Sequence, residues 1–283
     1  MYRHARHITH QRKRLGQVFL RDPLVIERIM MSAALAPYDT VLEIGPGRGA
    51  LTVPLAQRAQ TLYAIEIDRH YAEVLGQRFL PHPHVHILHA DARAYDYTQL
   101  PAPLVVVANL PYSMGLPILR RLFAFRQRLS RLIIMFQKEV AARFLAQPAT
   151  STYGALSVFF QYYAEIRCCF EVSRQAFSPV PAVDSTVLSF TPFTPLPWPS
   201  INESFFLSIV RYAFAHRRKT LRANLLAATH LGLTKAQLAE IYNTLHLTEN
   251  VRAQELHVRQ FVQLADTLHG LLPTAKTPGR HQL

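Results

Sequence analysis

The feature that most constrains this chain is a short apolar run that ends in a cluster of glycines. Residues 41–44 read Val-Leu-Glu-Ile and are followed by Gly45, Gly47 and Gly49. A run of this length and composition predicts a buried strand. Glycine allows backbone angles and close approaches that a side chain would prevent, so a ligand can lie against the main chain. We therefore expect a strand that turns through glycines into a helix and forms one wall of a ligand site.

Further apolar runs alternate with helical stretches over the first two thirds of the chain. Because helices separate the strands, the pattern is typical of an α/β fold with a doubly wound, Rossmann-like parallel sheet. Asp22 followed by Pro23 predicts a capped helix that runs through Leu35. The strands are expected at residues 40–44, 61–68, 85–89, 104–108, 131–136, 166–172 and 186–190.

A proline-rich segment at residues 191–199 interrupts this pattern. Proline can continue neither a helix nor an inner strand, so the segment is expected to separate two domains. Beyond it, residues 203–226 and 235–245 show helical periodicity. We therefore expect an α/β domain over residues 1–195 and a smaller helical domain over residues 200–283.

Basic residues outnumber acidic ones and are concentrated in blocks. The chain has 31 Lys and Arg against 18 Asp and Glu, a formal net charge of +13. Residues 1–21, 97–138 and 204–239 contain neither Asp nor Glu. Segments that are rich in arginine and lack acidic residues are typical of proteins that bind nucleic acids. The residues expected to contact RNA are Arg120, Arg121, Arg217, Arg218, Lys219 and Arg222.

The basic block of the C-terminal domain is expected to lie on one helix that begins before Arg211 and ends after Arg222. Phosphate contacts position a nucleic acid, and folded RNA is recognised largely by its shape. We therefore expect this domain to dock the RNA. The alternative is that these cations only solvate a helix or tie the two domains together. The His- and Arg-rich N-terminal stretch is either a third anchor or a solvated tail.

Several other classes of protein are not favoured. Cys168 and Cys169 are adjacent, so a disulfide between them could not cross-link distant parts of the chain. This cysteine usage indicates a reducing compartment. No apolar run approaches the length of a membrane span, and the first twenty residues lack the core of a secretory signal. Four histidines lie between residues 82 and 89, but no Cys or carboxylate completes a zinc set. We expect a cytoplasmic protein without a membrane segment or a metal site.

Polar residues follow the glycine turn at the ends of successive strands. Glu66 comes 21 positions after Gly45, a spacing at which a carboxylate reaches the ribose hydroxyls of a bound nucleoside. A dinucleotide fits this geometry, with its pyrophosphate on the helix N-terminus and Ala50 within the loose form of the fingerprint. S-adenosylmethionine carries no phosphate and needs a polar group near its adenine, which Asp91 supplies. The ordered set, completed by Asn109, favours S-adenosylmethionine.

The sharpest motif is Asn109-Leu110-Pro111-Tyr112, which follows another apolar strand. The exocyclic amine of adenine is a poor nucleophile, and acceptors must hold its N–H bonds as the nitrogen pyramidalises. The Asn109 amide oxygen and the Leu110 carbonyl can serve, with Pro111 fixing the turn. Tyr112 offers a ring on which a flipped base stacks, worth ~1–3 kcal/mol. The motif predicts methyl transfer to adenine by polarisation and proximity rather than by a strong base.

The chain resembles a known family, the ribosomal RNA adenine dimethyltransferases, which modify two adjacent adenosines near the 3′ end of small-subunit (16S) rRNA. The resemblance covers residues 13–264. It implies a cofactor pocket for S-adenosylmethionine and a Phe177 that packs against the target base opposite Tyr112. It also implies a monomer that acts on small-subunit rRNA within an assembling 30S-type particle. The motifs are Gly16-Gln17-Val18-Phe19-Leu20, the glycine turn, Glu66, Asp91, residues 109–112, residues 177–185 and residues 217–221. The cofactor residues expected are Val18, Leu20, Gly45, Gly47, Glu66, Asp91 and Asn109.

Two positions depart from the family pattern. The family usually has Asn or His where this chain has Val18, so only a backbone contact to the cofactor remains there. It usually has Lys where Ala182 stands, which removes a cation beside the base-binding loop.

Two alternatives compete with this interpretation. A large-subunit rRNA methylase of the kind that confers macrolide resistance shares the sheet motifs, but residues 217–221 and the loop that begins at Phe177 argue against it. A non-catalytic binding protein, either a ribosome-assembly factor or a relative among transcription factors, would have an eroded catalytic turn. Residues 109–112 are intact.

Overall fold

The structure is a computed structural model that describes residues 18–272, and the chain divides into two compact units. Among the described residues, the first unit contains residues 18–141 together with Glu165–Pro192, and the second contains Ala142–Ala164 and residues 193–272. The division after Pro192 falls in the proline-rich segment. The sequence placed the domain boundary at residues 195–200. It did not predict that residues 142–164, which precede this boundary, belong to the helical unit.

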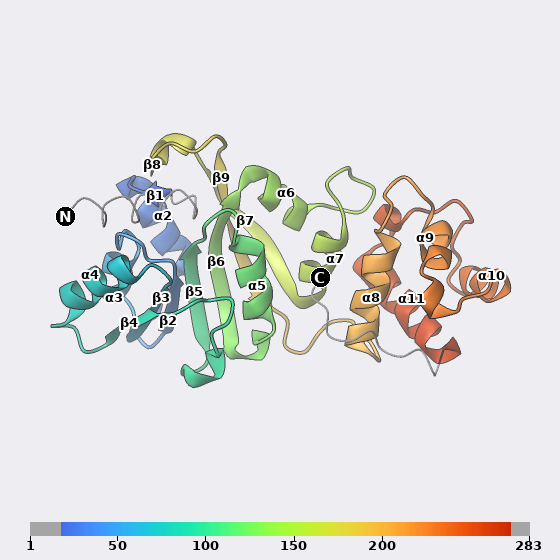
Figure 1. The fold of residues 1–283 in the computed structure, drawn as a ribbon, viewed down its shortest axis with the longest axis horizontal. Coiled ribbons are helices and arrows are strands. Elements are labelled where there is room, and N and C mark those ends of the chain that lie inside the picture. The colour runs from blue at the N-terminus through green and yellow to red at the C-terminus, as the bar shows by residue number, and fades with distance from the viewer. Residues whose placement is uncertain (1–17, 273–283) are drawn as a thin grey trace, which may run out of the picture. The chain divides into compact units, whose positions relative to one another are not determined.

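The first unit is built on a seven-stranded sheet (Figure 1). The strand order is β4-β3-β2-β5-β6-β9-β7. All seven expected strands are present, and the expected Rossmann-like α/β class is confirmed. The expectation of a fully parallel sheet is wrong at β9, which pairs with β6 in the antiparallel direction. The strands are β2 (Thr40–Ile44), β3 (Thr61–Glu66), β4 (Val85–His89), β5 (Leu104–Asn109), β6 (Leu129–Gln137), β7 (Ala164–Val172) and β9 (Ser185–Pro192).

The helices of this unit begin with α2 (Pro23–Ala33). Asp22 caps α2 as expected, because its carboxylate accepts hydrogen bonds from the backbone N–H groups of Leu24, at 2.9 Å, and Val25, at 3.3 Å. The helix ends before Leu35, since Ala34 is left-handed with φ of 46°. The others are α3 (Thr52–Ala56), α4 (Arg69–Phe79) and α5 (Gly115–Phe123), with 3₁₀ turns η1 (Tyr97–Gln99), η2 (Arg126–Arg128) and η3 (Arg174–Ala176). Helix α6 (Lys138–Leu145) begins in this unit and ends in the second.

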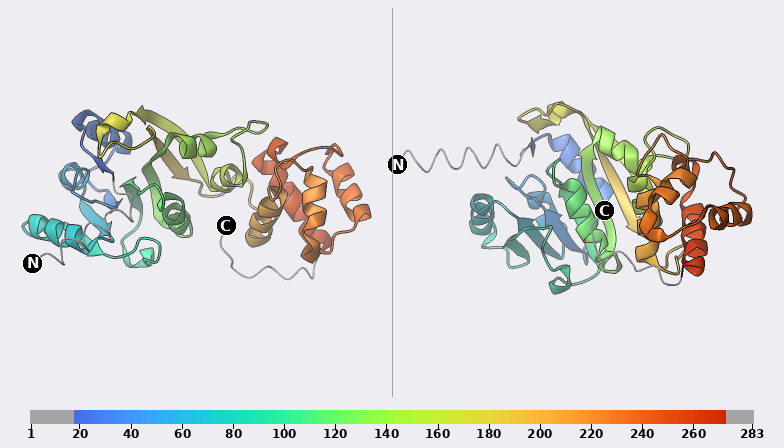
Figure 2. Two further views of the ribbon diagram at one scale, coloured as in Figure 1. Left: turned by 45° about the horizontal axis from the view of Figure 1, so that its top comes forward. Right: turned by 45° about the vertical axis from the view of Figure 1, so that its right-hand side comes forward.

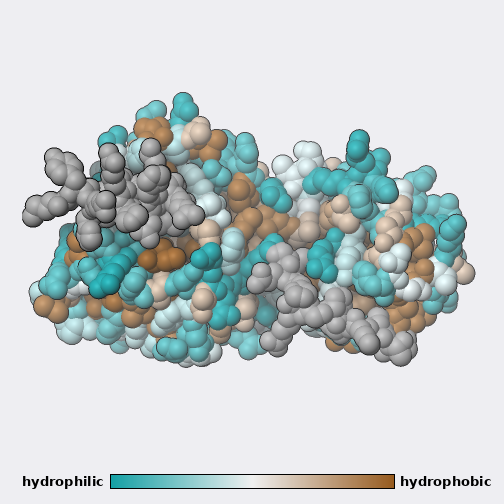
Figure 3. Space-filling model, viewed as in Figure 1, coloured by the Kyte–Doolittle hydropathy of each residue, from teal (hydrophilic) through white to brown (hydrophobic). Residues whose placement is uncertain are grey.

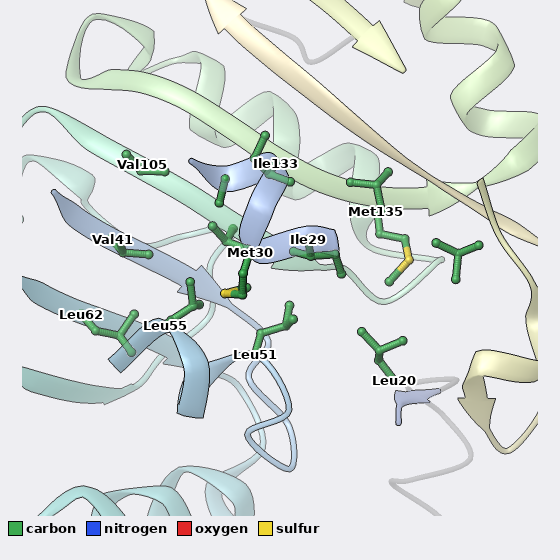
Figure 4. Close-up of a cluster of buried hydrophobic side chains, with 14 of the residues drawn as sticks. Leu20, Ile29, Met30, Val41, Leu51, Leu55, Leu62, Val105, Ile133 and Met135 are labelled. Atoms are coloured by element: carbon green, nitrogen blue, oxygen red, sulfur yellow. The ribbon is translucent and has the colours of Figure 1, made fainter. Parts of the chain in front are cut away.

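Apolar side chains cover both faces of the sheet, which explains why its inner strands read as continuous apolar runs. On β6, Ile133 and Met135 point into a cluster shared with α2, α3 and α4 (Figure 4). Phe136, from the alternate set of β6 residues, lies against Gly115 of α5 on the other face. The core therefore holds the carboxyl ends of the strands in fixed positions.

A separate two-stranded sheet consists of β1 (Phe19–Leu20) and β8 (Phe177–Ser178). The two strands are antiparallel, with Leu20 opposite Phe177. This pairing joins segments that are far apart in the sequence, so the N-terminal motif and the loop before β9 meet in space.

The second unit is helical, and its C-terminal helices appear in orange and red in Figure 2. Tyr162 of α7 packs on Phe206 of α8, with ring centroids 4.4 Å apart, which explains why α7 belongs to this unit. The helices are α7 (Ala155–Tyr163), α8 (Glu203–Ala213), α9 (Leu221–Ala227), α10 (Lys235–Thr244) and α11 (Val258–Leu271), with 3₁₀ turns η4 (Thr229–Leu231) and η5 (Ala253–Glu255).

The expectation of a single helix over residues 203–226 is wrong, because a turn at residues 214–220 separates α8 from α9. The buried Asn224 side chain donates hydrogen bonds to the carbonyls of Ala213, at 2.7 Å, and His216, at 3.1 Å. Thr220 caps α9 by accepting from the Ala223 backbone N–H. These hydrogen bonds stabilise the turn, so the chain does not continue as one helix from α8 into α9.

None of the helices within residues 18–272 combines the length and the apolar character needed to cross a membrane.

Candidate active site

A cavity of about 510 Å³ lies at the carboxyl ends of β2, β3 and β5. Its size falls within the range of small-molecule and cofactor sites, which is about 300–1,000 Å³. The cavity brings together polar groups that are separated by tens of residues in the sequence. The expected site residues that line it are Val18, Leu20, Gly45, Gly47, Glu66, Asp91, Asn109, Leu110, Pro111 and Tyr112.

The glycine turn forms one wall of the cavity with a backbone that other residues adopt only with strain. Gly45 and Gly47 have φ values of 70° and 54°. A Cβ atom on Gly47 would stand 3.1 Å from the ring of Phe19. Glycine is therefore required here by both its dihedral angle and the space around it.

Glu66, at the end of β3, connects this turn to the sheet through hydrogen bonds. Its side chain is buried, and its two carboxylate oxygens accept hydrogen bonds from the backbone N–H groups of Gly47, at 2.9 Å, and Asp68, at 2.8 Å. Burial raises the pKa of Glu66, and these two bonds counteract the rise. Each carboxylate oxygen keeps a further lone pair, so the group can also accept from ligand hydroxyls.

Asp91 follows β4 and is engaged with Arg93. The Arg93 backbone N–H donates to Oδ1 of Asp91 at 2.9 Å, and the Arg93 guanidinium donates to both carboxylate oxygens. The hydrogen bond from the Arg93 side chain lowers the pKa of Asp91, which stays ionised. Arg93 also lines the cavity, a role that no sequence pattern indicated.

The Asn-Leu-Pro-Tyr turn begins where β5 ends. The backbone N–H of Met114 donates to the carbonyl of Pro111 at 2.9 Å and closes the turn. The Tyr112 hydroxyl lies 2.9 Å from Oγ of Ser185, the buried first residue of β9. Burial raises the pKa of Tyr112, so its hydroxyl is neutral. The ring is thus held at both ends, by the turn and by Ser185, the last residue of the motif at residues 177–185, to which the sequence assigned no role of its own.

Phe177 is not where the resemblance placed it. Its side chain is 1% exposed, belongs to the apolar cluster between the sheet and α2, and does not line the cavity. Its partner in the two-stranded sheet is Leu20, and the adjacent Ser178 lines the cavity instead. Burying the apolar ring in this cluster is more favourable than exposing it, so Phe177 does not enter the cavity that Tyr112 lines.

The N-terminal motif is represented by Val18, Phe19 and Leu20. Val18 is half-buried against the apolar cluster and lines the cavity, so it offers main-chain groups and an apolar surface. The Phe19 ring lies under the Arg48 guanidinium, 4.5 Å from the ring centroid. Gly16, Gln17 and the His- and Arg-rich stretch before them lie outside the described residues.

Glu43 is a lining residue that sequence reasoning missed. It is 2% exposed, and its Oε2 atom has no hydrogen-bond partner in the structure. Burial raises the pKa of Glu43 to about 8; the neighbouring Thr52 hydroxyl opposes this rise, and repulsion from Glu66 adds to it. The available signal was a carboxylate inside the apolar run Val-Leu-Glu-Ile.

Of the two arginines that follow the turn, Arg121 has structural partners and Arg120 is half-buried. Arg121 donates to the carbonyl of Tyr95, at 2.9 Å from its Nη2 atom, and its guanidinium lies over the Phe125 ring. Arg120 is half-buried, and burial lowers its pKa. The expectation that Arg120 and Arg121 bind RNA therefore draws no support from their surroundings.

The basic residues of the second unit lie on different elements, so the expectation of one basic helix is wrong. Arg218 and Lys219 are exposed in the turn between α8 and α9. Arg217, in the same turn, donates to the carbonyl of Ser151 at 2.7 Å. Arg222, on α9, lies 3.5 Å from a carboxylate oxygen of Glu249. Figure 3 shows hydrophilic residues, in teal, interspersed over the surface of this unit on the right.

Within residues 18–272, no group of three or more His, Cys, Asp or Glu side chains could hold a metal ion.

A sheet of this order, a glycine turn after β2, a carboxylate at the end of β3 and another after β4 are the features of an S-adenosylmethionine-dependent methyltransferase. The family can be stated more narrowly. The family model described as ribosomal RNA adenine dimethylase matches residues 8–269, and the chain belongs to this family.

Known relatives agree with this assignment. The chain is 36% identical over 273 residues to Ribosomal RNA small subunit methyltransferase A of Hahella chejuensis, covering 95% of this chain and 97% of that protein. It is 40% identical over 265 residues to the protein of the same name from Geobacter metallireducens, covering 92% and 96%. The crystal structure of a dimethyladenosine transferase from Plasmodium falciparum matches with a TM-score of 0.72 and 25% identity, covering 87% of this chain and 95% of that one.

Proposed function

We propose that this protein transfers methyl groups from S-adenosylmethionine to the exocyclic amino groups of adenines in small-subunit rRNA. The observation that carries the proposal is that the glycine turn, Glu66 and the Asn109–Tyr112 segment all line the same cavity. The names of the relatives, which specify the small ribosomal subunit, support the choice of substrate.

The residues of the cavity fit S-adenosylmethionine. The main chain at Gly45 and Gly47 is open to the methionine portion, Glu66 can accept from the ribose hydroxyls, and Asp91 can accept from the adenine amine. When bound, S-adenosylmethionine supplies an electrophilic methyl group on a positively charged sulfur.

The chain itself orients the adenine. The Asn109 amide oxygen and the Leu110 carbonyl accept hydrogen bonds from the target amine, and the Tyr112 ring supports the base from one side. Asn109 is neutral, so it orients the amine and does not remove a proton from it beforehand. The reaction is thus driven by proximity and polarisation.

The finer features of the function belong to the same proposal. The target is the pair of adjacent adenosines near the 3′ end of 16S-type rRNA in an assembling 30S-type particle. The enzyme acts in the cytoplasm as a monomer. The helical unit docks the rRNA through the exposed turn that holds Arg218 and Lys219, which follows from charge and exposure.

Mass spectrometry of rRNA from cells that lack this protein tests the proposal. Small-subunit rRNA should lose dimethyladenosine, and the wild-type gene should restore it. An Asn109→Ala gene should not restore it, which would exclude a purely structural role in ribosome assembly. Loss of methylation from large-subunit rRNA instead would favour the alternative suggested by the 26% identity and TM-score of 0.68 to the 23S rRNA methyltransferase ErmE.

A further inference from the structure

Glu43 is a buried carboxyl group that the proposed reaction does not use. It lies on β2 between Leu42 and Ile44, with Ala64 of β3 and Val107 of β5 as neighbours in the sheet. Despite this apolar setting, it lines the cavity, and its Oε2 atom has no hydrogen-bond partner. An unpaired polar atom in such a setting costs free energy unless a ligand or a proton compensates it.

The neighbouring carboxylate of Glu66 differs from Glu43 in this respect. Burial raises the pKa of both groups. Two backbone N–H bonds stabilise the ionised form of Glu66, whereas the Thr52 hydroxyl opposes the rise for Glu43 only in part and leaves its pKa at about 8. Glu43 is therefore mostly protonated at neutral pH in the free protein, while Glu66 remains the preferred site of negative charge.

Besides Glu66, few other charged or titratable groups line the cavity. The glycine turn contributes Arg48, the segment after β1 contributes Arg21, and the segment after β4 contributes Asp91 paired with Arg93. Tyr112 is neutral, because burial raises its pKa. Neither His nor Cys is among the lining residues within the described chain. Glu43 is thus the lining group most able to change its protonation state when a charged ligand binds.

The substrate and product forms of the cofactor differ in charge. S-adenosylmethionine has a sulfonium, and S-adenosylhomocysteine has a neutral thioether in its place. The methyl donor therefore carries one more positive charge than the product. In a partly dehydrated cavity this charge stabilises a nearby carboxylate more than it would in water.

We propose that Glu43 makes the cavity selective for the cationic methyl donor: it is protonated in the free protein and releases its proton to solvent when S-adenosylmethionine binds. The carboxylate that remains attracts the sulfonium. After methyl transfer the product lacks that charge, so Glu43 takes up a proton again and the product leaves more readily. This inference rests on the proposed function, because it assumes the same cofactor.

Titration calorimetry of the full-length protein tests the proposal without measuring activity. S-adenosylmethionine is titrated at about pH 7 in two buffers with different ionisation enthalpies, which gives the number of protons released. Glu43→Gln removes the titrating group with little change of shape. Glu73→Gln is the matched control, because Glu73 lies on α4 in an exposed ion pair with Arg69 that lowers its pKa.

The wild type and Glu73→Gln should release between about one half and one proton more than Glu43→Gln. The difference between the variants cancels any proton exchanged by the ligand itself. S-adenosylhomocysteine should give less than half of this difference. At about pH 8, Glu43→Gln should lower the preference for S-adenosylmethionine over the product by about 5-fold or more, which is the usual scale of coupling between sites.

Equal proton release by the wild type and Glu43→Gln would overturn the proposal. So would an unchanged preference between the two ligands. If Glu43→Gln fails to fold, the wild type alone decides, because equal proton release with both ligands would also refute a response to the sulfonium. Failure of the wild type to bind S-adenosylmethionine would instead refute the proposed function, so the two failures are distinguishable.

Discussion

Glu43 should also make the stability of the ligand-free protein depend on pH, and Glu43→Gln should remove that dependence. The pKa of Glu43 is raised from 4.5 to about 8 in the folded state. Between these values the folded state binds a proton that the unfolded state has lost. Stability is therefore highest below the unfolded pKa and falls as the pH rises towards about 8, the reverse of the usual behaviour of a carboxyl group.

The size of the effect follows from the shift. Each pKa unit corresponds to about 1.4 kcal/mol, so the full shift sets an upper limit of about 4–5 kcal/mol between acid and alkaline conditions. Water penetration and relaxation around the cavity reduce such penalties, and we expect roughly 2–4 kcal/mol. Glutamine resembles the protonated glutamic acid, so the variant should match the wild type near about pH 5 and be more stable near about pH 8.5.

Urea unfolding followed by circular dichroism at several pH values measures this directly. The quantity that matters is the difference in unfolding free energy between the wild type and Glu43→Gln at each pH, because other titrating groups cancel in it. A difference that does not change between about pH 5 and pH 8.5 would show that Glu43 is solvated or paired, and would refute the reasoning.

Three further predictions concern catalysis and docking. Asn109→Ala should lower single-turnover methylation by about 100-fold or more while cofactor affinity stays within a few-fold, as for loss of a preorganised acceptor; a near wild-type rate would show that positioning suffices. Ser185→Ala should free the Tyr112 hydroxyl and cost about 0.5–1.5 kcal/mol in the methylation barrier, with Ser185→Thr restoring part of the loss; equal rates for wild type and both variants would remove the tether from the mechanism. Replacing Arg218 and Lys219 with Glu should flatten the salt dependence of binding to small-subunit particles by up to about two units of slope, and an unchanged slope would contradict docking through this turn.

The arrangement of the site was largely predictable from the sequence. Strands at the centre of a parallel sheet are buried on both faces, so β2, β5 and β6 stand out as apolar runs. Parallel strands bring their carboxyl ends to one edge, and the residues that follow them therefore meet. Gly45, Glu66, Asp91 and Asn109 line one cavity for this reason.

Other features were decided only when the chain folded. The break between α8 and α9 depends on Asn224, whose side chain bonds to carbonyls eight and eleven residues earlier. Arg121 resembles an exposed cation in the sequence, but its guanidinium is held by the Tyr95 carbonyl. Hydropathy patterns record neither kind of contact, because they do not show which distant backbone groups need a partner.

The sequence by itself thus determined which strands form and which polar residues share their edge, because local periodicity and strand order suffice for both. The tertiary structure decided how each side chain is used. It buried Phe177 in the apolar cluster, placed Ser185 against Tyr112 and left one carboxyl oxygen of Glu43 unpaired in the cavity wall. These outcomes depend on packing and desolvation by residues far away in the chain, which no local pattern records.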